Sequence, residues 1–137
     1  MRRLTVVVLA LVCAACADHL PDQDLRILSV ARPDAKLSAQ DLWMGFRTDA
    51  LAATRKYFGR SVDVSAVVTS FEADPKKTPH LYFSQNTEHG VRARLLDDRA
   101  ADTLKDVKAG DRITLRCFCE GIDSKQDLLL KSCIRAR

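Results

Sequence analysis

Apolar residues recur at helical spacing in the segment that follows residue 37. They fall on one face of a helix, at Leu42, Phe46, Ala50, Ala53 and Tyr57. Ser38 stands where a helix N-cap is expected, and Asp41 three residues later resembles a capping box in which Asp replaces the preferred Glu. Gly59 is a suitable C-terminal stop. The pattern predicts an amphipathic helix from Ser38 to about Gly59, with one face packed against the rest of the protein.

Beyond Gly59 the apolar residues alternate with polar ones, as they do in strands that bury one face. The alternation is clearest in Val62, Val64, Ala66 and Val68. Five strands are predicted, over 61–71, 80–84, 91–95, 113–120 and 128–134. A polar segment over 97–107 suits a short helix between the third and fourth strands. This connectivity is that of an OB-fold. We therefore expect a mainly β protein with an N-terminal α-helix, built as a five-stranded OB-fold barrel over residues 37–137.

The first 17 residues are typical of a secretion signal. Arg2 and Arg3 give a positively charged start, residues 4–12 are apolar apart from Thr5, and residues 13–17 are all Cys or Ala. The apolar run is too short to span a bilayer, but it fits the core of a signal peptide. We therefore expect residues 1–17 to be a signal peptide and the protein to be exported to the periplasmic side of a bacterial envelope.

Two processing routes remain open at the end of this segment. Ala15-Cys16-Ala17 has the form of an A-x-A cleavage site, which would release a soluble protein that begins at Asp18. Ala14-Ala15-Cys16 instead resembles the end of a lipobox, although Cys13 stands where an aliphatic residue is usual. The sequence favours lipidation of Cys16, which would anchor the domain to a membrane surface without spanning it.

Residues 18–36 resemble a tether between the membrane and the domain. Pro21, Asp22, Pro33 and Asp34 interrupt any regular period. Within this stretch, residues 26–30 are expected to form a short extended piece.

The charge balance makes nucleic acid an unlikely partner. The chain has 22 Lys and Arg against 18 Asp and Glu. Without Arg2 and Arg3 the net charge falls to +2, since 20 basic residues remain against 18 acidic ones. Non-specific binding to nucleic acid depends on many phosphate neutralisations and therefore on a densely basic surface.

Several short motifs together resemble one family. They are Lys56-Tyr57-Phe58-Gly59-Arg60, the valine-rich 62–68, Ala109-Gly110-Asp111, Cys119-Glu120-Gly121 and Leu130-Lys131-Ser132-Cys133. In this order they are similar to the OB-fold lipoproteins, also described as tRNA-anticodon-domain-like, over residues 38–134. The sequence departs from that family at Cys117, where Gly is common, and at Arg47-Thr48-Asp49 within the N-terminal helix. The resemblance implies the OB fold and a lipoprotein signal, and the family has no settled biochemical role.

Three cysteines follow the signal segment, at 117, 119 and 133. Disulfides persist in exported proteins. A three-residue hairpin loop at 125–127 would place Cys119 directly opposite Cys133, close enough to bridge. We therefore expect the disulfide Cys119–Cys133 and a buried thiol at Cys117. The alternative, a metal site made by Cys117, Cys119 and Cys133 with His80 or His89, is disfavoured because a single Cys-x-Cys is a weak signature. No metal or cofactor is expected.

Strands two and three of the predicted barrel form the usual ligand face of an OB fold. Their outward positions are His80, Tyr82, Ser84, Arg92 and Arg94. An aromatic ring beside two arginines suits stacking and anion contact, although an ordinary solvated face has the same pattern. Four of these five residues, His80, Tyr82, Arg92 and Arg94, are the candidate ligand face.

The sequence contains no nucleophile–base motif, paired-carboxylate motif or phosphate-binding glycine loop. We therefore expect a non-enzymatic envelope lipoprotein that acts as a small binding or assembly module. The alternative is a soluble periplasmic protein that binds a glycan or a small anion. An envelope protein is a further possible partner.

Overall fold

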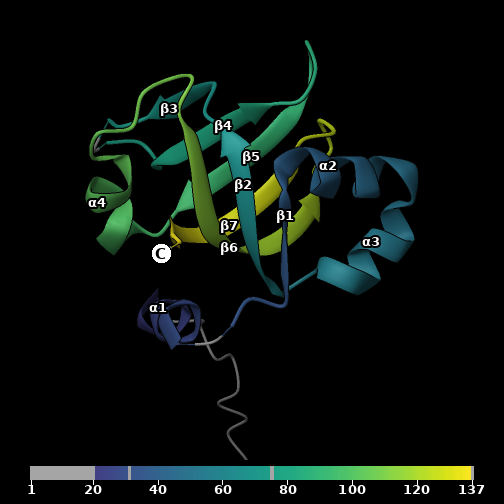
Figure 1. Ribbon diagram of the computed structural model, residues 1–137, viewed down its shortest axis with the longest axis horizontal. Helices are drawn as coiled ribbons and strands as arrows, with labels where there is room; N and C mark the ends of the chain where they lie inside the picture. The colour runs from purple at the N-terminus through teal and green to yellow at the C-terminus, as the bar shows by residue number, and fades with distance from the viewer. Residues whose placement is uncertain (1–20, 31, 75, 137) are drawn as a thin grey trace, which may run out of the picture.

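The computed structural model describes residues 21–30, 32–74 and 76–136 (Figure 1). The predicted signal peptide 1–17 and the predicted lipidation site Cys16 lie outside these residues. The helices and strands are α1 Pro21–Val30, β1 Ala35–Ser38, α2 Ala39–Thr48, α3 Ala50–Tyr57, β2 Ser61–Val67, β3 Ser70–Glu72, β4 His80–Ser84, β5 Gly90–Leu95, the 3₁₀ helix η1 Asp97–Arg99, α4 Ala100–Leu104, β6 Arg112–Ile122 and β7 Leu128–Arg135. None of the described helices is long and apolar enough to cross a membrane.

The fold is mainly β with helices, as expected, but its sheet differs from a closed five-stranded barrel. Within the part of the chain that the structure describes, seven strands form one open sheet in the order β1-β2-β6-β7-β5-β4-β3. One extra strand is β1, which pairs parallel to β2 at an edge. The other arises because the predicted strand 61–71 is divided into β2 and β3. At the division the Val68 N–H donates to Asp111 O and the Thr69 N–H donates to Tyr82 O, so the chain changes partners there.

The alternation in the sequence correctly identified the core positions of the strands. Val62, Val64, Ala66 and Val68 are all buried. The same holds for the apolar positions of the later strands, which are Leu81, Phe83, Val91, Ala93, Leu95, Ile113, Leu115, Leu128 and Leu130. Side chains at alternate positions of a strand share a face, so these positions are readable without knowledge of the topology. The opposite face is not uniformly exposed, since Asp63 on β2 and Phe118 on β6 are also buried.

The predicted N-terminal helix is present but broken in two. Ser38 caps α2 as expected, since its Oγ accepts from the Asp41 N–H at 3.0 Å. Asp49 ends α2 and also begins α3, because its Oδ1 accepts from the Ala52 N–H at 3.0 Å. The break changes the buried face, so that Ala53 is buried whereas Ala50, predicted on that face, is exposed. Asp49 explains the interruption, because its short polar side chain competes for the backbone N–H groups of the helix.

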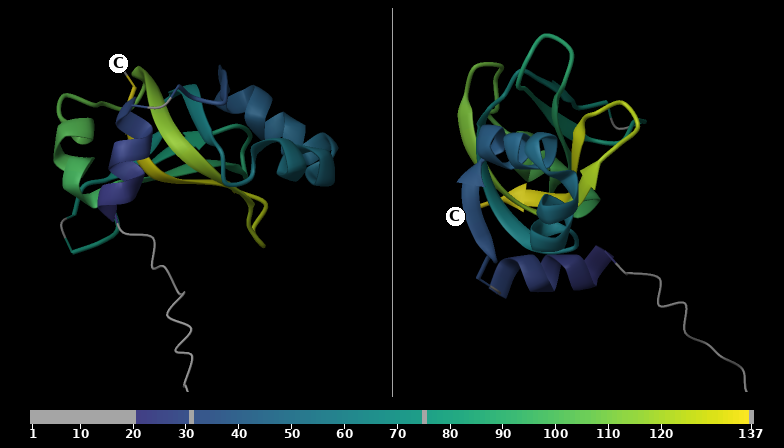
Figure 2. Two further views of the ribbon diagram at one scale, coloured as in Figure 1. Left: turned by 90° about the horizontal axis from the view of Figure 1, so that it is seen from below. Right: turned by 90° about the vertical axis from the view of Figure 1, so that its right-hand side faces the viewer.

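Residues 26–30 are helical, so the extended piece expected within the tether is wrong. Pro21 begins α1, a place where its fixed φ and missing N–H are tolerated. Leu28 is 1% exposed, and Leu28 O accepts from Arg116 Nη1 at 3.1 Å. These contacts come from residues almost 90 positions away in the sequence, so local pattern does not reveal them. Figure 2 shows α1 and α4 toward one end of the sheet and α2 and α3 toward the other.

The predicted disulfide Cys119–Cys133 is also wrong. Cys133 is bonded to Cys117, with a Cα–Cα distance of 4.2 Å, and Cys119 is a buried free thiol. Ile122 pairs with Leu128, so the hairpin loop covers 123–127 and is longer than expected. Register shifts on either side of Cys119 then place it opposite Leu130. Gly121 and Ser132 have positive φ at these irregularities, as bulged residues often do.

The free thiol of Cys119 is expected to be unreactive in the folded protein. Burial raises its pKa from 9.0 to about 11, which lowers the thiolate fraction at pH 8 by about a hundredfold. We expect iodoacetamide at pH 8 to label Cys119 only when the protein is unfolded in urea without reductant. Peptide mass spectrometry measures this labelling. Rapid labelling of the native protein would show that the thiol is accessible.

Candidate ligand-binding face

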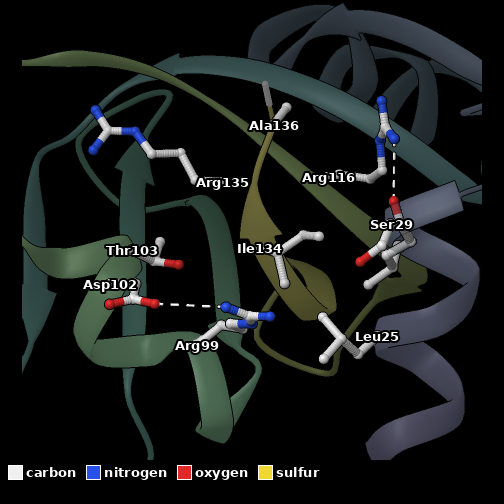
Figure 3. A pocket seen from close by; sticks show the side chains of 10 residues that line it. Leu25, Ser29, Arg99, Asp102, Thr103, Arg116, Ile134, Arg135 and Ala136 are labelled. Carbon is white, nitrogen blue, oxygen red and sulfur yellow. Dashed lines mark hydrogen bonds and ion pairs between the residues drawn. The ribbon is translucent and has the colours of Figure 1, made fainter.

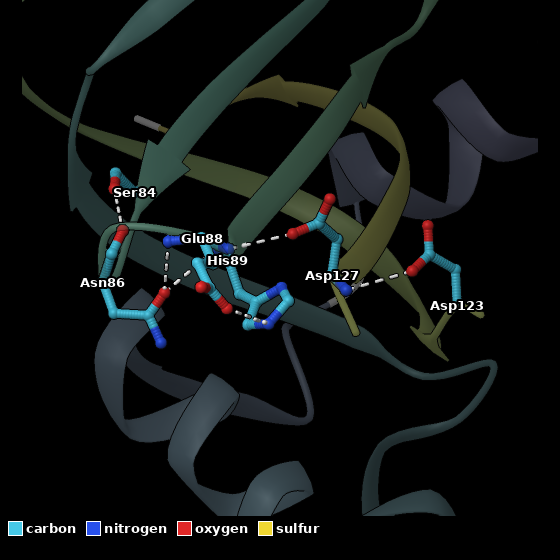
Figure 4. A network of polar contacts seen from close by, with 7 residues as sticks. Ser84, Asn86, Glu88, His89, Asp123 and Asp127 are labelled. Carbon is cyan, nitrogen blue, oxygen red and sulfur yellow. Dashed lines mark hydrogen bonds and ion pairs between the residues drawn. The ribbon is translucent and has the colours of Figure 1, made fainter. Parts of the chain in front are cut away.

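The structure brings the four predicted face residues together. In the β4–β5 pair, His80 lies opposite Arg94 and Tyr82 lies opposite Arg92. We call these four residues the β4–β5 face. Arg94 is exposed and the other three are half-buried. The loops at 85–89 and 123–127 lie at the end of these strands (Figure 4). The geometry establishes that the residues share a surface, and their role in binding stays a prediction.

Asp127 anchors this face, and the sequence interpretation missed it. Its Oδ1 accepts from the Gly90 N–H at 3.0 Å, and its Oδ2 lies 3.8 Å from Arg92 Nη2. Its own N–H donates to Asp123 Oδ1 at 3.0 Å (Figure 4). The Asp127 side chain is only 9% exposed. The carboxylate therefore joins the hairpin loop 123–127 to the start of β5 and fixes Arg92. In the sequence, Asp123 and Asp127 indicated only a turn. No local feature predicts the bond between Asp127 and Gly90, which lies 37 residues earlier in the chain.

Tyr82 lies close against Gly90. A Cβ atom placed on Gly90 would be 2.9 Å from Tyr82 Cζ and Oη and would clash with Phe83 O. Only glycine therefore fits beside the Tyr82 ring. Burial and then the charge of Asp127 raise the pKa of Tyr82, and Arg92 opposes this effect. The phenol is protonated at neutral pH, as an ordinary tyrosine is, and it lies beside the Arg92 guanidinium with its own hydrogen bond directed to Asp127.

Arg92 carries the least satisfied donor of the face. Its Nε is buried and has no hydrogen-bond partner among the described residues. The side chain as a whole is 42% exposed. A buried donor without a partner costs free energy, which an acceptor on a ligand could recover. The fixed planar guanidinium of arginine favours carboxylate or phosphate acceptors.

The loop beside the face is held by its own polar groups. Ser84 Oγ donates to Asn86 O at 2.7 Å. Asn86 Oδ1 accepts from the N–H groups of Glu88 and His89, at 2.9 and 2.6 Å. Figure 4 shows these bonds closing the loop next to Asp127. Such turns based on an Asn side chain fix the loop, so the edge of the face is pre-organised.

The face is mixed in charge. Glu72 on β3 lies opposite His80 and forms an ion pair of 3.7 Å with Lys77. Asp127 offsets Arg92 from the other side. Among the described residues, no three His, Cys, Asp or Glu side chains are placed to hold a metal ion, and Cys117 and Cys133 are joined to each other.

Comparison with solved structures supports the fold. One similar structure is that of a "putative nucleic acid-binding lipoprotein" from Klebsiella pneumoniae. The two share 12% identity and a TM-score of 0.59, over 74% of this chain and 91% of that chain. Likeness at this identity shows an OB-like fold alone. A comparison with curated proteins gave no match.

A family model matches nearly the whole sequence. The model of the tRNA_anti-like family covers residues 2–134, and so includes the β4–β5 face and the disulfide-bonded hairpin. The resemblance in the sequence motifs is therefore confirmed, and the chain belongs to the tRNA_anti-like family.

Proposed function

We propose that this protein is a non-catalytic binding module of the bacterial envelope, and that it binds ligand at the β4–β5 face. The observation that carries the proposal is the Tyr82–Arg92 pair, in which a protonated phenol lies beside a guanidinium whose Nε has no partner among the described residues. The backbone hydrogen-bond partners change between Val68 and Thr69, so that β2 and β3 can be regarded as two halves of one strongly bent strand. On that reading β4 and β5 are strands two and three of an OB-type barrel, where such barrels bind ligands.

The chemistry of the face favours an acidic glycan. An aromatic ring can pack against the apolar face of a sugar, and the two arginines can pair with a carboxylate. The acidic groups nearby, Glu72 and Asp127, disfavour a uniformly charged polymer. Glycans with carboxylates are also abundant in the compartment to which the N-terminal segment would direct the protein.

Envelope anchoring forms part of the same proposal. The N-terminal segment has the composition of a lipoprotein signal, and the similar Klebsiella structure is described as a lipoprotein. Lipid on Cys16 would keep the face near the membrane, because α1 begins at Pro21 and is held against the domain by Arg116. The alternative is a soluble periplasmic form that begins at Asp18 and has the same face.

Single-stranded nucleic acid is a second candidate, favoured by the description of the Klebsiella protein. The two ligands differ in how salt affects their affinity. Binding to a nucleic acid weakens steeply with salt because each neutralised phosphate releases counterions. A single carboxylate on a glycan gives a shallow dependence.

The test is an NMR titration of the exported protein with disaccharide-peptide fragments that carry free carboxylates. We expect shifts at His80, Tyr82 and Arg94. Arg94→Gln and Arg92→Gln should each weaken binding about fivefold, since a charge-assisted contact at a partly exposed site contributes about 1 kcal/mol.

Arg55→Gln on α3 is the matched control, because Arg55 is an exposed arginine outside the face. It should leave the affinity unchanged. An equal effect of Arg55→Gln, or binding only of an oligothymidylate with a steep salt dependence, would contradict the glycan proposal.

A further inference from the structure

The two most exposed large apolar side chains of the described residues lie on one side of α3. Leu51 is 62% exposed, and Phe58, the residue that caps the helix at its C-terminal end, is 60% exposed. They are seven positions apart and therefore fall on the same side of the helix, whereas Ala53 on the opposite side is buried. Single apolar residues are normal at a protein surface, but a pair on one side of a helix forms a local apolar surface.

The backbone around Phe58 is fixed to the sheet. The Phe58 N–H donates to Thr54 O at 3.0 Å within α3. The Gly59 N–H then donates to Cys119 O at 2.9 Å, and the Cys119 N–H donates to Arg60 O at 3.1 Å. The exposed ring of Phe58 therefore belongs to a segment that is bonded to β6, and not to a loose loop.

The charges around this apolar pair are positive. Arg55 lies four positions after Leu51 and on the same side of the helix. The segment 50–60 contains no Asp or Glu. The pair and the exposed basic residues of this segment, which we call the α3 surface, are Leu51, Arg55, Lys56, Phe58 and Arg60.

The acidic groups on the adjoining segments are already engaged. Asp49 precedes α3, and its Oδ1 accepts from the Ala52 N–H at 3.0 Å. Glu120 follows Cys119 on β6 and lies 3.9 Å from Lys131 Nζ. The α3 surface therefore keeps its positive charge and is complementary to an anionic surface.

The C-terminal end of α3 lies on the side of the molecule where the described chain begins. Figure 1 shows this end of α3 directed to the lower side, below which α1 lies, and the right-hand view of Figure 2 agrees. Cys16, the expected lipidation site, is five positions before Pro21, where α1 begins. Five residues span at most about 18 Å, so lipid on Cys16 would hold this side close to a membrane.

α1 has a fixed place on the domain. Arg116 Nη1 donates to Leu28 O at 3.1 Å, and Leu28 is buried. Figure 3 shows Arg116 reaching α1 beside Ser29, at the wall of a cavity of about 520 Å³. The start of the described chain therefore keeps its position relative to α3.

We propose that the α3 surface docks on an anionic lipid bilayer, with Leu51 and Phe58 in the headgroup region and the basic residues against lipid phosphates. The inference rests on the lipid anchor of the proposed function and goes beyond it, since the β4–β5 face takes no part. A second copy of the chain is disfavoured, because a symmetric contact through this surface would place like charges opposite each other.

The test is flotation of the full chain carrying Cys16→Ser, which cannot be lipidated, with vesicles of equal parts phosphatidylglycerol and phosphatidylcholine. We expect binding at least about tenfold tighter than to phosphatidylcholine alone, because anionic lipids attract basic residues near the surface. Added salt should weaken this binding. Phe58→Ser and Arg55→Gln should each weaken it about fivefold, since one removes the inserted ring and the other a charge.

Phe71→Ser on β3 and Arg94→Gln on β5 are matched controls, because both residues are exposed and lie outside the α3 surface. Both should bind vesicles normally, and thermal melts show which variants are folded. Equal binding to neutral vesicles, normal binding by folded Phe58→Ser, or self-association without vesicle binding would overturn the proposal. Neither lipid on Cys16 nor a glycan enters this experiment, so its failure is distinguishable from failure of the proposed function.

Discussion

Replacement of Cys117 by alanine is expected to lower the free energy of unfolding by about 3 kcal/mol. The Cys117–Cys133 bridge closes a loop with a sequence separation of 16. Its loss frees the unfolded chain from that constraint, and in a small domain this is a large share of the total stability. Urea unfolding followed by circular dichroism measures the change. Dithiothreitol should destabilise the wild-type protein by a similar amount and leave the variant unaffected.

Cys119→Ala is the matched control for this experiment. It removes a buried sulfur atom but retains the bridge, so it should cost about 1 kcal/mol and remain sensitive to dithiothreitol. The opposite pattern, in which Cys119→Ala abolishes the sensitivity and Cys117→Ala retains it, would restore the pairing suggested by the sequence.

Replacement of Asp63 by alanine should cost about 3 kcal/mol, because it removes the two charge-assisted hydrogen bonds that the buried Asp63 carboxylate accepts from the half-buried Arg116 guanidinium. Asp63 accepts from Arg116 Nε at 2.7 Å and from Nη2 at 3.0 Å, and the two side chains are 9% and 19% exposed. Arg116 also donates to Leu28 O, so the change should loosen α1. Urea unfolding gives the free energy, and hydrogen exchange at residues 25–29 reports on α1.

Asp102→Ala provides the comparison for an exposed pair. Asp102 and Arg99 are 78% and 50% exposed, so loss of their contact should change stability by no more than about 0.5 kcal/mol. The double variant Asp63→Leu with Arg116→Met should recover most of the stability lost by Asp63→Ala, since apolar side chains then replace both charged groups. Equal effects of Asp63→Ala and Asp102→Ala would show that the buried pair is not a structural element.

The parts of the fold that were predictable are those fixed by local rules. Alternation identified the buried positions of the strands because side chains point to opposite faces at every second residue. The Ser38 cap was readable because the residue that accepts and the N–H that donates are three positions apart. That His80, Tyr82, Arg92 and Arg94 share one face was predictable from the alternation within two short strands, whereas the pairs His80–Arg94 and Tyr82–Arg92 come from the structure.

The parts that were missed depend on irregular backbone or on distant residues. The disulfide was assigned wrongly because the loop 123–127 and the irregularities near Gly121 and Ser132 change the register between β6 and β7. A shift of one residue moves a side chain to the other face. α1 was missed because its stability comes from Arg116 and the end of β7 rather than from its own sequence. Asp127 was missed because its partner Gly90 lies in another strand.

Export to the envelope is the claim on which the other inferences depend, because it makes the disulfide stable and glycans available. The most direct test is the intact mass of the protein purified from bacterial envelopes, before and after reduction. We predict a chain that begins at a Cys16 carrying diacylglycerol, with a gain of about 2 Da on reduction of one disulfide. A chain that retains residues 1–17, carries no lipid and shows no mass change on reduction would contradict the account.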